Sequence, residues 1–462
     1  MSSVNRPQLS LTETLFQLRD SRFLAIFLFG FCSGFPWVLH GSVLTLWMQE
    51  SGLSRSMIGY VGAIATVYAV NWTWAPLVDN LKIPLLTRKL GQRRSWILLG
   101  QGLIAIIVLA LSFTDPRSSL GLVSLLAFSI ALVSATLDIA VDAYRITIFR
   151  AEEMDSKMPY AAAMSTVGWF AGYGFIGGAV ALALGGETIG MSWSDVYKIV
   201  AVVYCFIMLL VLLTPVPEDE LRETTGTPFD MEGNEAEAKP DLGGRFYNFV
   251  LEPFLEFFRR CGFKLAFSIL LFLVIFRLGE AMLGRMSLVF YVELGFSTDQ
   301  ISFYNKFFGG LVTAGFSLLG AVINTRYGVV RGLLIAGTAM AAANLLFALL
   351  AVVGPNIGLF VITLIVDNFF QAFATVAAIS FISYFTSRTH TGTQYAMMSS
   401  ISNFGRTTLA AGSGAVVDFL GGQWAIFFIL TTLMVIPGLC LLMWVGRLLK
   451  GYEGSDATYS KL

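Results

Sequence analysis

Three ionisable side chains share one helical face in the segment 134–145, which closes a long apolar run. Asp138, Asp142 and Arg145 follow one another at intervals of four and three residues, which places them on one side of an α-helix. Ionised carboxylates are costly inside hydrocarbon, so they normally face a water-filled path or a partner and mark a route for an ion or a ligand. We predict proton coupling at Asp138 and Asp142, and gating at Arg145. The alternative is that Asp142 and Arg145 pair only to lock a loop.

A second group of charges interrupts the apolar run at 263–292. There Arg277, Glu280 and Gly284 share one helical face, and Arg285 lies beside it. Glu280 falls near the middle of a bilayer by length, where a carboxyl group pairs with a cation or binds a proton. We interpret Glu280 as a third proton-coupling carboxylate, and the alternative is a static ion pair with Arg277. Arg285 is the candidate for binding a ligand carboxylate, because a guanidinium can donate two parallel hydrogen bonds to it.

Further polar and aromatic side chains inside apolar runs are candidates for binding a polar ligand. They are Trp37, His40, Lys306, Asp367, Asn368, Gln371, Gln394, Asn403 and Arg406. Amides and cations bind hydroxyl, amide and carboxylate groups, and an indole ring can cover a sugar face. Other roles remain open. Trp37 and His40 can belong to a kinked packing helix, Lys306 can extend to the membrane surface, and Arg406 can clamp a carboxylate of another helix. Asp367 can also serve as a protonatable site.

The composition indicates which elements hold these residues. The chain is 56% hydrophobic and only 13% charged, and it contains 45 Gly, which favours close helix packing in lipid. This is typical of a membrane protein that crosses the bilayer many times. A formal net charge of zero gives no support to a nucleic-acid partner. The four cysteines are isolated and the two histidines are far apart, so we expect no metal site.

Twelve apolar runs of membrane-spanning length can be marked, bounded by polar turns. They lie at about 23–49, 55–79, 95–113, 120–147, 160–184, 196–215, 263–292, 299–324, 331–353, 358–386, 393–418 and 423–447. Lys and Arg gather in alternate gaps, so the positive-inside rule places both termini in the cytoplasm. The predicted fold class is an all-α polytopic membrane protein with twelve transmembrane helices in two six-helix halves.

One long hydrophilic segment divides the chain. It is acidic and rich in Pro and Gly, and it ends in an amphipathic run expected to lie on the inner leaflet. The N-terminus lacks a cleavable signal pattern and is expected to be retained. The predicted organisation is a cytoplasmic tail (1–22), a six-helix bundle (23–215), a cytoplasmic linker with the amphipathic helix (216–262), a second six-helix bundle (263–447) and a cytoplasmic tail (448–462).

The two halves resemble each other in sequence. The fifth run begins at Tyr160 and has Ser165 downstream, and the eleventh begins at Tyr395 and has Ser400 at the same offset. A weak internal repeat of this kind is typical of transporters that alternate access between two halves.

Corresponding gaps of the two halves carry the predicted gate. Asp79, Arg93 and Arg94 occupy the gap after the second run, and Asn324 and Arg331 occupy the gap after the eighth. The order of small residue, acid or amide, glycine and basic residues resembles the loop signature of the major facilitator superfamily, although Asn324 stands where an aspartate is usual. A carboxylate at one helix end and cations at the membrane face can form a contact that opens and closes. Plain topology signals are the alternative.

Three longer segments carry a more specific resemblance. They are PYAAAMSTVGWFAGYGF, FRLGEAMLGRMSLVFYVELGF and TQYAMMSSISNFGRTTLAAGSG. They resemble the AmpG-type muropeptide permeases of the same superfamily, over nearly all twelve runs. The resemblance implies proton-driven import of anhydro-muropeptides (GlcNAc-anhydroMurNAc and its peptides) from the periplasm, for cell-wall recycling and β-lactamase induction. It implies a monomer in the bacterial inner membrane, with lipid, protons and the muropeptide as partners and no cofactor beyond the proton gradient.

Other functions fit the same residues. One is a permease or exporter for another sugar- or acyl-containing metabolite, and another is a muropeptide sensor that does not transport. A membrane enzyme is disfavoured, because the sequence has no HExxH or GxSxG motif and its carboxylates are spread over distant runs. We therefore expect a transporter without catalytic residues.

Overall fold

The computed structural model describes residues 20–53, 61, 63–175, 177–185, 189–217, 251–296, 300, 304, 308–407 and 412–452. All regular secondary structure within these ranges is helical. The prediction of an all-α protein is therefore confirmed.

The helices of residues 20–217 form the first group. In chain order they are α2 (Ser21–Trp37), the π-helix η1 (Val38–Val43), α3 (Leu44–Glu50), η2 (Ala63–Thr66), α5 (Val67–Val70), η3 (Asn71–Thr73), α6 (Ala75–Asn80), α7 (Leu86–Leu90), α8 (Gln92–Leu111), α9 (Leu120–Thr147), η4 (Ala151–Glu153), α10 (Met154–Phe170), the π-helix η5 (Ala171–Phe175), α11 (Gly177–Gly185) and α12 (Trp193–Leu212).

The helices from residue 251 onward form the second group. They are α15 (Glu252–Cys261), α16 (Phe263–Ile275), α17 (Leu278–Leu294), α19 (Gly309–Tyr327), α20 (Val329–Val353), α21 (Ile357–Phe385), α22 (Thr391–Thr407), α23 (Ser413–Phe419) and α24 (Trp424–Tyr452). Helix α15 falls inside the predicted linker. Helix α24 continues to Tyr452, whereas the sequence predicted its end at residue 447.

Nine helical stretches among the described residues are long and apolar enough to cross a membrane. The sequence predicted twelve spans, and the structure shows why three of them are not among these nine. The run 55–79 is divided into short helices from η2 to α6, and α19 is described only from Gly309. Helix α22 is rich in Ser, Thr and Asn, so its mean hydropathy is low.

The outer surface is suited to lipid. Helix α12 exposes Val202, Phe206 and Leu209 at 70%, 60% and 60% of their surface, on one stripe of the helix. Helix α8 exposes Leu103 and Ile106 in the same way. Continuous apolar stripes of this kind would be unstable in water, and they face hydrocarbon in a membrane protein.

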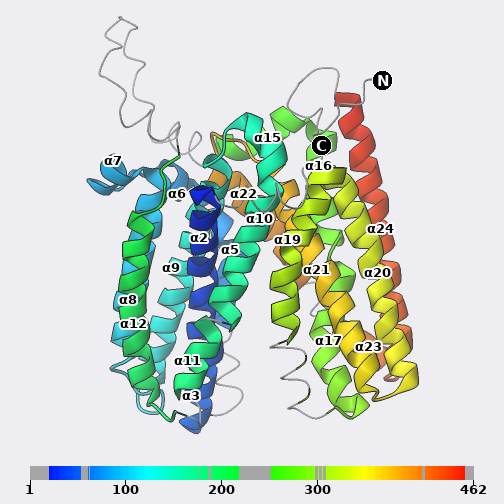
Figure 1. Ribbon diagram of the computed structural model, residues 1–462, viewed down its shortest axis with the longest axis horizontal. Helices are drawn as coiled ribbons and strands as arrows, with labels where there is room; N and C mark the ends of the chain where they lie inside the picture. Colours follow the sequence, from blue (N-terminus) through cyan, green and yellow to red (C-terminus); the bar gives the residue numbers. More distant parts are fainter. Residues whose placement is uncertain are drawn as a thin grey trace, which may run out of the picture.

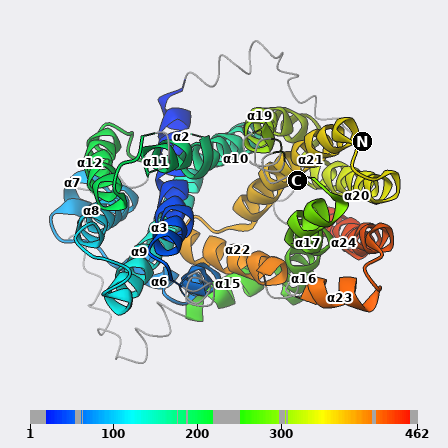
Figure 2. The same cartoon turned by 90° about the horizontal axis from the view of Figure 1, so that it is seen from below.

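The two groups of helices meet along two seams. Helix α10 packs against α19 and α21, and α22 packs against α9 and α6. Figure 2 shows α10, α19 and α22 where the two groups meet, whereas α8, α12, α20 and α24 lie at the outside. Figure 1 shows that the groups meet at the end that carries α7 and α15 and lie apart at the end that carries α3, α11 and α23. We call these the joined end and the parted end.

Candidate functional site

Asp79 links the two groups of helices at the joined end. Its carboxylate, at the end of α6, is paired with Arg93 at 2.7 Å, and its side chain is only 1% exposed. It also accepts hydrogen bonds from the backbone N–H of Gly392 (3.0 Å) and of Thr393 (2.6 Å), and from the Thr393 hydroxyl (2.6 Å). Arg93 donates to the hydroxyl of Thr391. The first turn of α22 presents unpaired N–H groups and a positive dipole, which favour an anion there.

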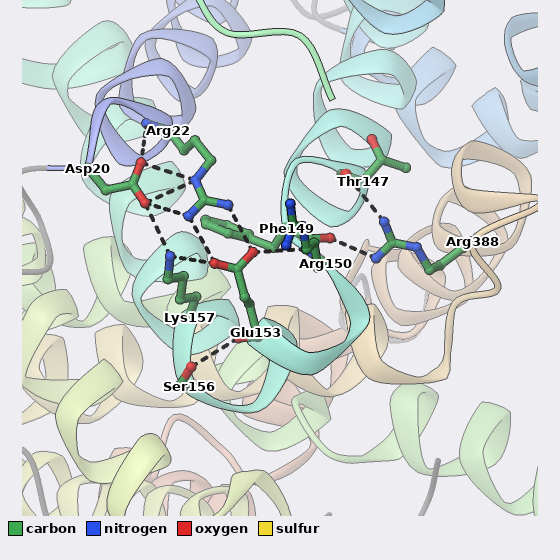
Figure 3. Close-up of polar contacts among 9 residues, drawn as sticks. All are labelled: Asp20, Arg22, Thr147, Phe149, Arg150, Glu153, Ser156, Lys157 and Arg388. Atoms are coloured by element: carbon green, nitrogen blue, oxygen red, sulfur yellow. Dashed lines mark hydrogen bonds and ion pairs between the residues drawn. The ribbon is translucent and has the colours of Figure 1, made fainter. Parts of the chain in front are cut away.

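Arg388 forms a second link of opposite polarity. This residue lies between α21 and α22, and its guanidinium donates to the backbone oxygen of Phe149 at 2.8 Å and that of Thr147 at 3.4 Å. Figure 3 shows Arg388 extending toward these carbonyls from the opposite group of helices. Nearby, the Tyr384 hydroxyl donates to the backbone oxygen of Met154. Because a helix C-terminus carries partial negative charge, the end of α9 is suited to bind a cation.

A network of four charges fixes the start of α2 to the loop after α9 (Figure 3). Arg22 pairs with Asp20 at 2.7 Å and with Glu153 at 2.9 Å, and Lys157 bonds to the same two acids. The hydrogen bonds that Arg22 donates, with a smaller contribution from Lys157, lower the pKa of Glu153 to about 2 despite its partial burial. This network holds the backbone that Arg388 contacts.

Gln394 lies at the joined end, although the sequence placed it with the ligand-binding residues. Its amide oxygen accepts from the backbone N–H of Ser387 and from Arg260, and its amide nitrogen donates to the backbone oxygen of Pro253 and to Glu256. The side chain is fully buried. Gln394 therefore fastens α15 to the start of α22, and its amide has no capacity left for a ligand in this state.

Two further contacts cross the seam beside η3. The ring of Phe254, on α15, packs edge-on against Trp72 with centroids 5.8 Å apart. The hydroxyl of Ser400, on α22, donates to the amide oxygen of Asn71, whose nitrogen donates to the backbone oxygen of Ala135. These contacts join α15, α22, η3 and α9 in one interface.

The predicted acidic stripe of α9 lies close to this interface. Arg145 pairs with Asp142 at 2.7 Å and is 2% exposed, and its guanidinium lies 4.9 Å from the ring centre of Tyr395 in the opposite group. It also donates to the hydroxyl of Ser165 at 3.3 Å. Asp138 lies one turn deeper, next to Asp142, with one carboxylate oxygen buried and without a hydrogen-bond partner among the described residues.

Acidic residues of the second group lie on α17 and α21. Glu280 accepts two hydrogen bonds from Arg277, at 2.8 and 2.9 Å. This is the ion pair that the sequence left as the alternative to proton coupling. Asp367 is buried and interacts electrostatically with Glu280. The adjacent Asn368 bonds to Thr313 of α19 at 3.0 Å, so its amide oxygen connects two helices.

The structure places the other predicted residues as follows. Gln371 and Asn403 are half-buried, on α21 and α22. Arg285 and Arg406 lie on described backbone of α17 and α22, but their side chains are outside the described part, and Lys306 is outside it altogether.

Three of the predicted gating residues do not take part in the contact that Asp79 forms at the joined end. Arg94 bonds to the backbone oxygens of Val211 and Leu212, and so fastens α12 within its own group. Asn324 is 1% exposed and packs against Gly332 in its own group, and Arg331 is exposed at the start of α20. These three residues therefore do not contribute to the contact of Asp79 in this state, and their role in gating stays a prediction.

Sequence reasoning missed several residues of the interface. They are Tyr384, Arg388, Thr391, Gly392 and Thr393 at the joined end, and Tyr395 beside Arg145. Two signals were available, because Arg388 is a lone cation in a short gap and Tyr395 starts the internal repeat.

The sequence matches the family model for the Major Facilitator Superfamily over residues 26–324. The chain belongs to the major facilitator superfamily. Relatives place it in the AmpG-type branch of that superfamily. "Putative transporter AmpG 4" of Rickettsia conorii is 31% identical over 427 residues, covering 92% of this chain and 97% of that protein. "Anhydromuropeptide permease" of Escherichia coli K12 is 28% identical over 430 residues, covering 93% and 80%. This superfamily member is thus a membrane transporter and not an enzyme.

Solved structures of the superfamily have the same fold. The proton:xylose symporter XylE superposes with a TM-score of 0.63 at 14% identity, covering 93% of this chain and 96% of that one. FucP in the outward conformation gives a TM-score of 0.60 at 14% identity, covering 92% and 99%.

Proposed function

We propose that this transporter imports anhydro-muropeptides, GlcNAc-anhydroMurNAc and its peptides, from the periplasm to the cytoplasm, coupled to protons, for cell-wall recycling. The observation that carries the choice of cargo is the similarity to the anhydromuropeptide permease of E. coli, which extends over 93% of this chain. Transport is by alternating access, with twelve membrane-spanning helices in two six-helix halves moving about the two seams.

We assign the joined end to the cytoplasm of a bacterium, with the protein in the inner membrane and acting as a monomer. Support comes from the basic residues Lys82, Arg88, Lys89, Arg150 and Arg388, which lie in loops or short helices at this end. Cytoplasmic loops carry an excess of Lys and Arg. Both termini are then cytoplasmic, and in the described state the two groups are joined at the cytoplasmic end.

The proposed coupling uses carboxylates in both groups of helices. Asp142 on α9 is paired with Arg145, Asp138 lies one turn away on the same helix, and Glu280 on α17 is paired with Arg277. A buried carboxylate that gains a proton loses its attraction for its arginine, which changes the relative stability of two conformations. Protonation from the periplasm together with cargo binding would favour opening of the joined end, and release of both in the cytoplasm would reset it.

The test is uptake of a labelled GlcNAc-anhydroMurNAc peptide into liposomes that contain the purified protein, with an inward proton gradient. We expect uptake to collapse when a protonophore is added. We expect Asp138→Asn to abolish gradient-driven uptake and Asp115→Asn, at an exposed loop, to leave it unchanged. Undiminished gradient-driven uptake by Asp138→Asn would refute the coupling assignment. Binding of the ligand to wild-type protein without uptake would indicate a sensor, and neither binding nor uptake would refute the cargo.

A further inference from the structure

Five aromatic side chains gather in the first group of helices, and Tyr68 among them lies close enough to Asp138 to interact with it electrostatically. The ring of Trp37 stacks on Tyr68 with centroids 4.2 Å apart and planes inclined by 29°. The Tyr68 hydroxyl lies 3.2 Å from Nε2 of His40. Trp169 stacks on Tyr173 at 4.8 Å and 27°. The two stacks meet at an angle, since the indoles of Trp37 and Trp169 are 6.5 Å apart and inclined by 63°. The cluster contains two indole rings that form a corner.

The corner depends on an unusually close approach of α2 and α10. A Cβ added at Gly34 would lie 2.2 Å from the backbone oxygen of Trp169, and one added at Gly168 would lie 2.2 Å from that of Phe27. Only glycine allows backbones to touch at these positions. Each helix then changes into a π-helix, η1 directly after Trp37 and η5 directly after Phe170. π-Helical turns are rare and occur frequently at functional sites.

The cluster lies on the side of its group that faces the second group. Trp37 contacts rings on α5 and α10. These two elements border the seams, because α5 contacts α22 and α10 contacts α19. At 1.5 Å per residue, Trp37 and Trp169 lie about 24 and 20 Å along their spans from Ser21 and Ser156 at the joined end. The cluster is therefore near the middle of the membrane or slightly beyond it, toward the parted end.

The exposure of the rings distinguishes the cluster from ordinary core. Trp37, Trp169 and Tyr173 are each partly exposed, whereas core aromatics such as Phe29 and Tyr144 are fully buried. Each indole is covered by a tyrosine on one face. A stacked pair held in this way presents a rigid apolar plane, and the His40–Tyr68 hydrogen bond restricts movement of one pair further.

We infer that Trp37 and Trp169, supported by Tyr68 and Tyr173, form a platform that binds the sugar rings of the cargo. The C–H groups on one face of a pyranose form an apolar surface that packs on an indole, while its hydroxyl and acetamide groups stay free for hydrogen bonds. Two indole planes at an angle fit two linked sugar rings better than a single indole plane does. This inference rests on the proposed function and adds that the first group of helices recognises the disaccharide part of the ligand.

The experiment measures equilibrium binding to the purified protein of the peptide-free disaccharide GlcNAc-anhydroMurNAc. We expect Trp169→Ala and Trp37→Ala each to weaken binding by about tenfold, and Trp169→Phe to lose less, because a ring is retained. The matched control is Trp444→Ala, on α24 of the other group, where 41% of the indole is exposed. We expect this control to bind like the wild type. Unchanged melting temperatures would establish that the variants are folded.

The outcomes separate this inference from the proposed function. If the wild type binds the disaccharide and both alanine variants bind it equally well, the platform is wrong while the cargo stands. If Trp444→Ala weakens binding as much as Trp169→Ala, the effect is structural and the platform is also wrong. If an alanine variant fails to fold, the double variant Trp37→Phe and Trp169→Phe decides, since undiminished affinity would overturn the inference. If the wild type binds neither the disaccharide nor its peptide, the proposed cargo itself is wrong.

Discussion

Among the described residues, the carboxylate of Asp79 forms several hydrogen bonds between the two groups of helices. It is 1% exposed and accepts three hydrogen bonds from Gly392 and Thr393 across the seam, besides its ion pair with Arg93. The substitution Asp79→Asn keeps the shape of the side chain but replaces one acceptor oxygen with a donor NH2. Both oxygens face donors in the structure, so an amide in either orientation places one donor against another.

The expected effect can be estimated from these contacts. Removing one partner from a buried, hydrogen-bonded charge pair costs about 3–5 kcal/mol, partly because the other charge is left unpaired. Arg93 keeps a bond to Thr391, so we take a smaller value of about 2 kcal/mol for the loss in the joined state. About 1.4 kcal/mol corresponds to a factor of ten in an equilibrium constant. The population of the joined state, relative to states in which this end is open, should therefore fall about 30-fold.

Spin labels at Lys89 and Tyr327, which are exposed at the joined end on opposite groups, would measure this shift. The background should lack Cys32, Cys205, Cys261 and Cys440. We expect a single short distance in the wild type and a longer one added or dominant in Asp79→Asn. Asp115→Asn is the control, because it makes the same chemical change at an exposed loop. A distance distribution in Asp79→Asn identical to that of the control would refute the reasoning.

Two other predictions concern the same end. Arg388→Ala should lengthen the same label distance, but less than Asp79→Asn does. The Arg388 side chain is half-buried, and its removal loses about 1–2 kcal/mol of charge-assisted hydrogen bonding to carbonyls. An effect larger than that of Asp79→Asn would contradict this prediction. Glu153→Gln should lower stability at pH 7 by about 0.5–1 kcal/mol, since the ion pair with Arg22 is partly exposed. The pKa of Glu153 in the fold is about 2, below its unfolded value of about 4.3. Its contribution is therefore complete above about pH 4.5 and is lost as the pH falls toward 2. The difference in melting temperature between Glu153→Gln and the wild type should shrink as the pH falls over that interval. A constant difference would contradict the assigned contribution of Glu153, and so would an equal effect of Glu152→Gln.

Local spacing indicated which side chains could pair. The interval of three residues between Asp142 and Arg145 implied a shared helical face, and the two side chains form the pair that was given as the alternative to coupling and gating. The same interval between Arg277 and Glu280 gave the ion pair that the sequence analysis had kept as an alternative. In both cases one helix determines the geometry, so periodicity is sufficient.

Contacts between distant helix ends could not be predicted in the same way. Asp79 and Thr393 are 314 residues apart, and no local pattern indicates which helix terminus a carboxylate will reach. Gln394 shows the converse case. An amide in an apolar run was interpreted as a ligand contact, but a short helix outside the membrane-spanning runs supplies its partners, Pro253 and Glu256.

Helix α9 connects the acidic residues to the joined end. It is a single helix of 28 residues that carries Asp138 and Asp142 and ends at Thr147. Asp138 and Thr147 are about 13 Å apart along the axis. Two residues of the opposite group contact the end of this helix and the residues just after it, Tyr395 through Arg145 and Arg388 through the carbonyls of Thr147 and Phe149.

This arrangement gives the proposed coupling a physical route. If Asp142 becomes neutral, the partners left to the buried Arg145 among the described residues are the Ser165 hydroxyl and the Tyr395 ring, which is unfavourable for a cation in a closed interface. Opening of the joined end would return this guanidinium to water. The same movement must break the bonds of Arg388, because a rigid helix cannot release Arg145 from Tyr395 and keep its terminal carbonyls in place. In the proposed mechanism, protonation on α9 would therefore be coupled to opening of this end through one element, without a long chain of intermediate contacts.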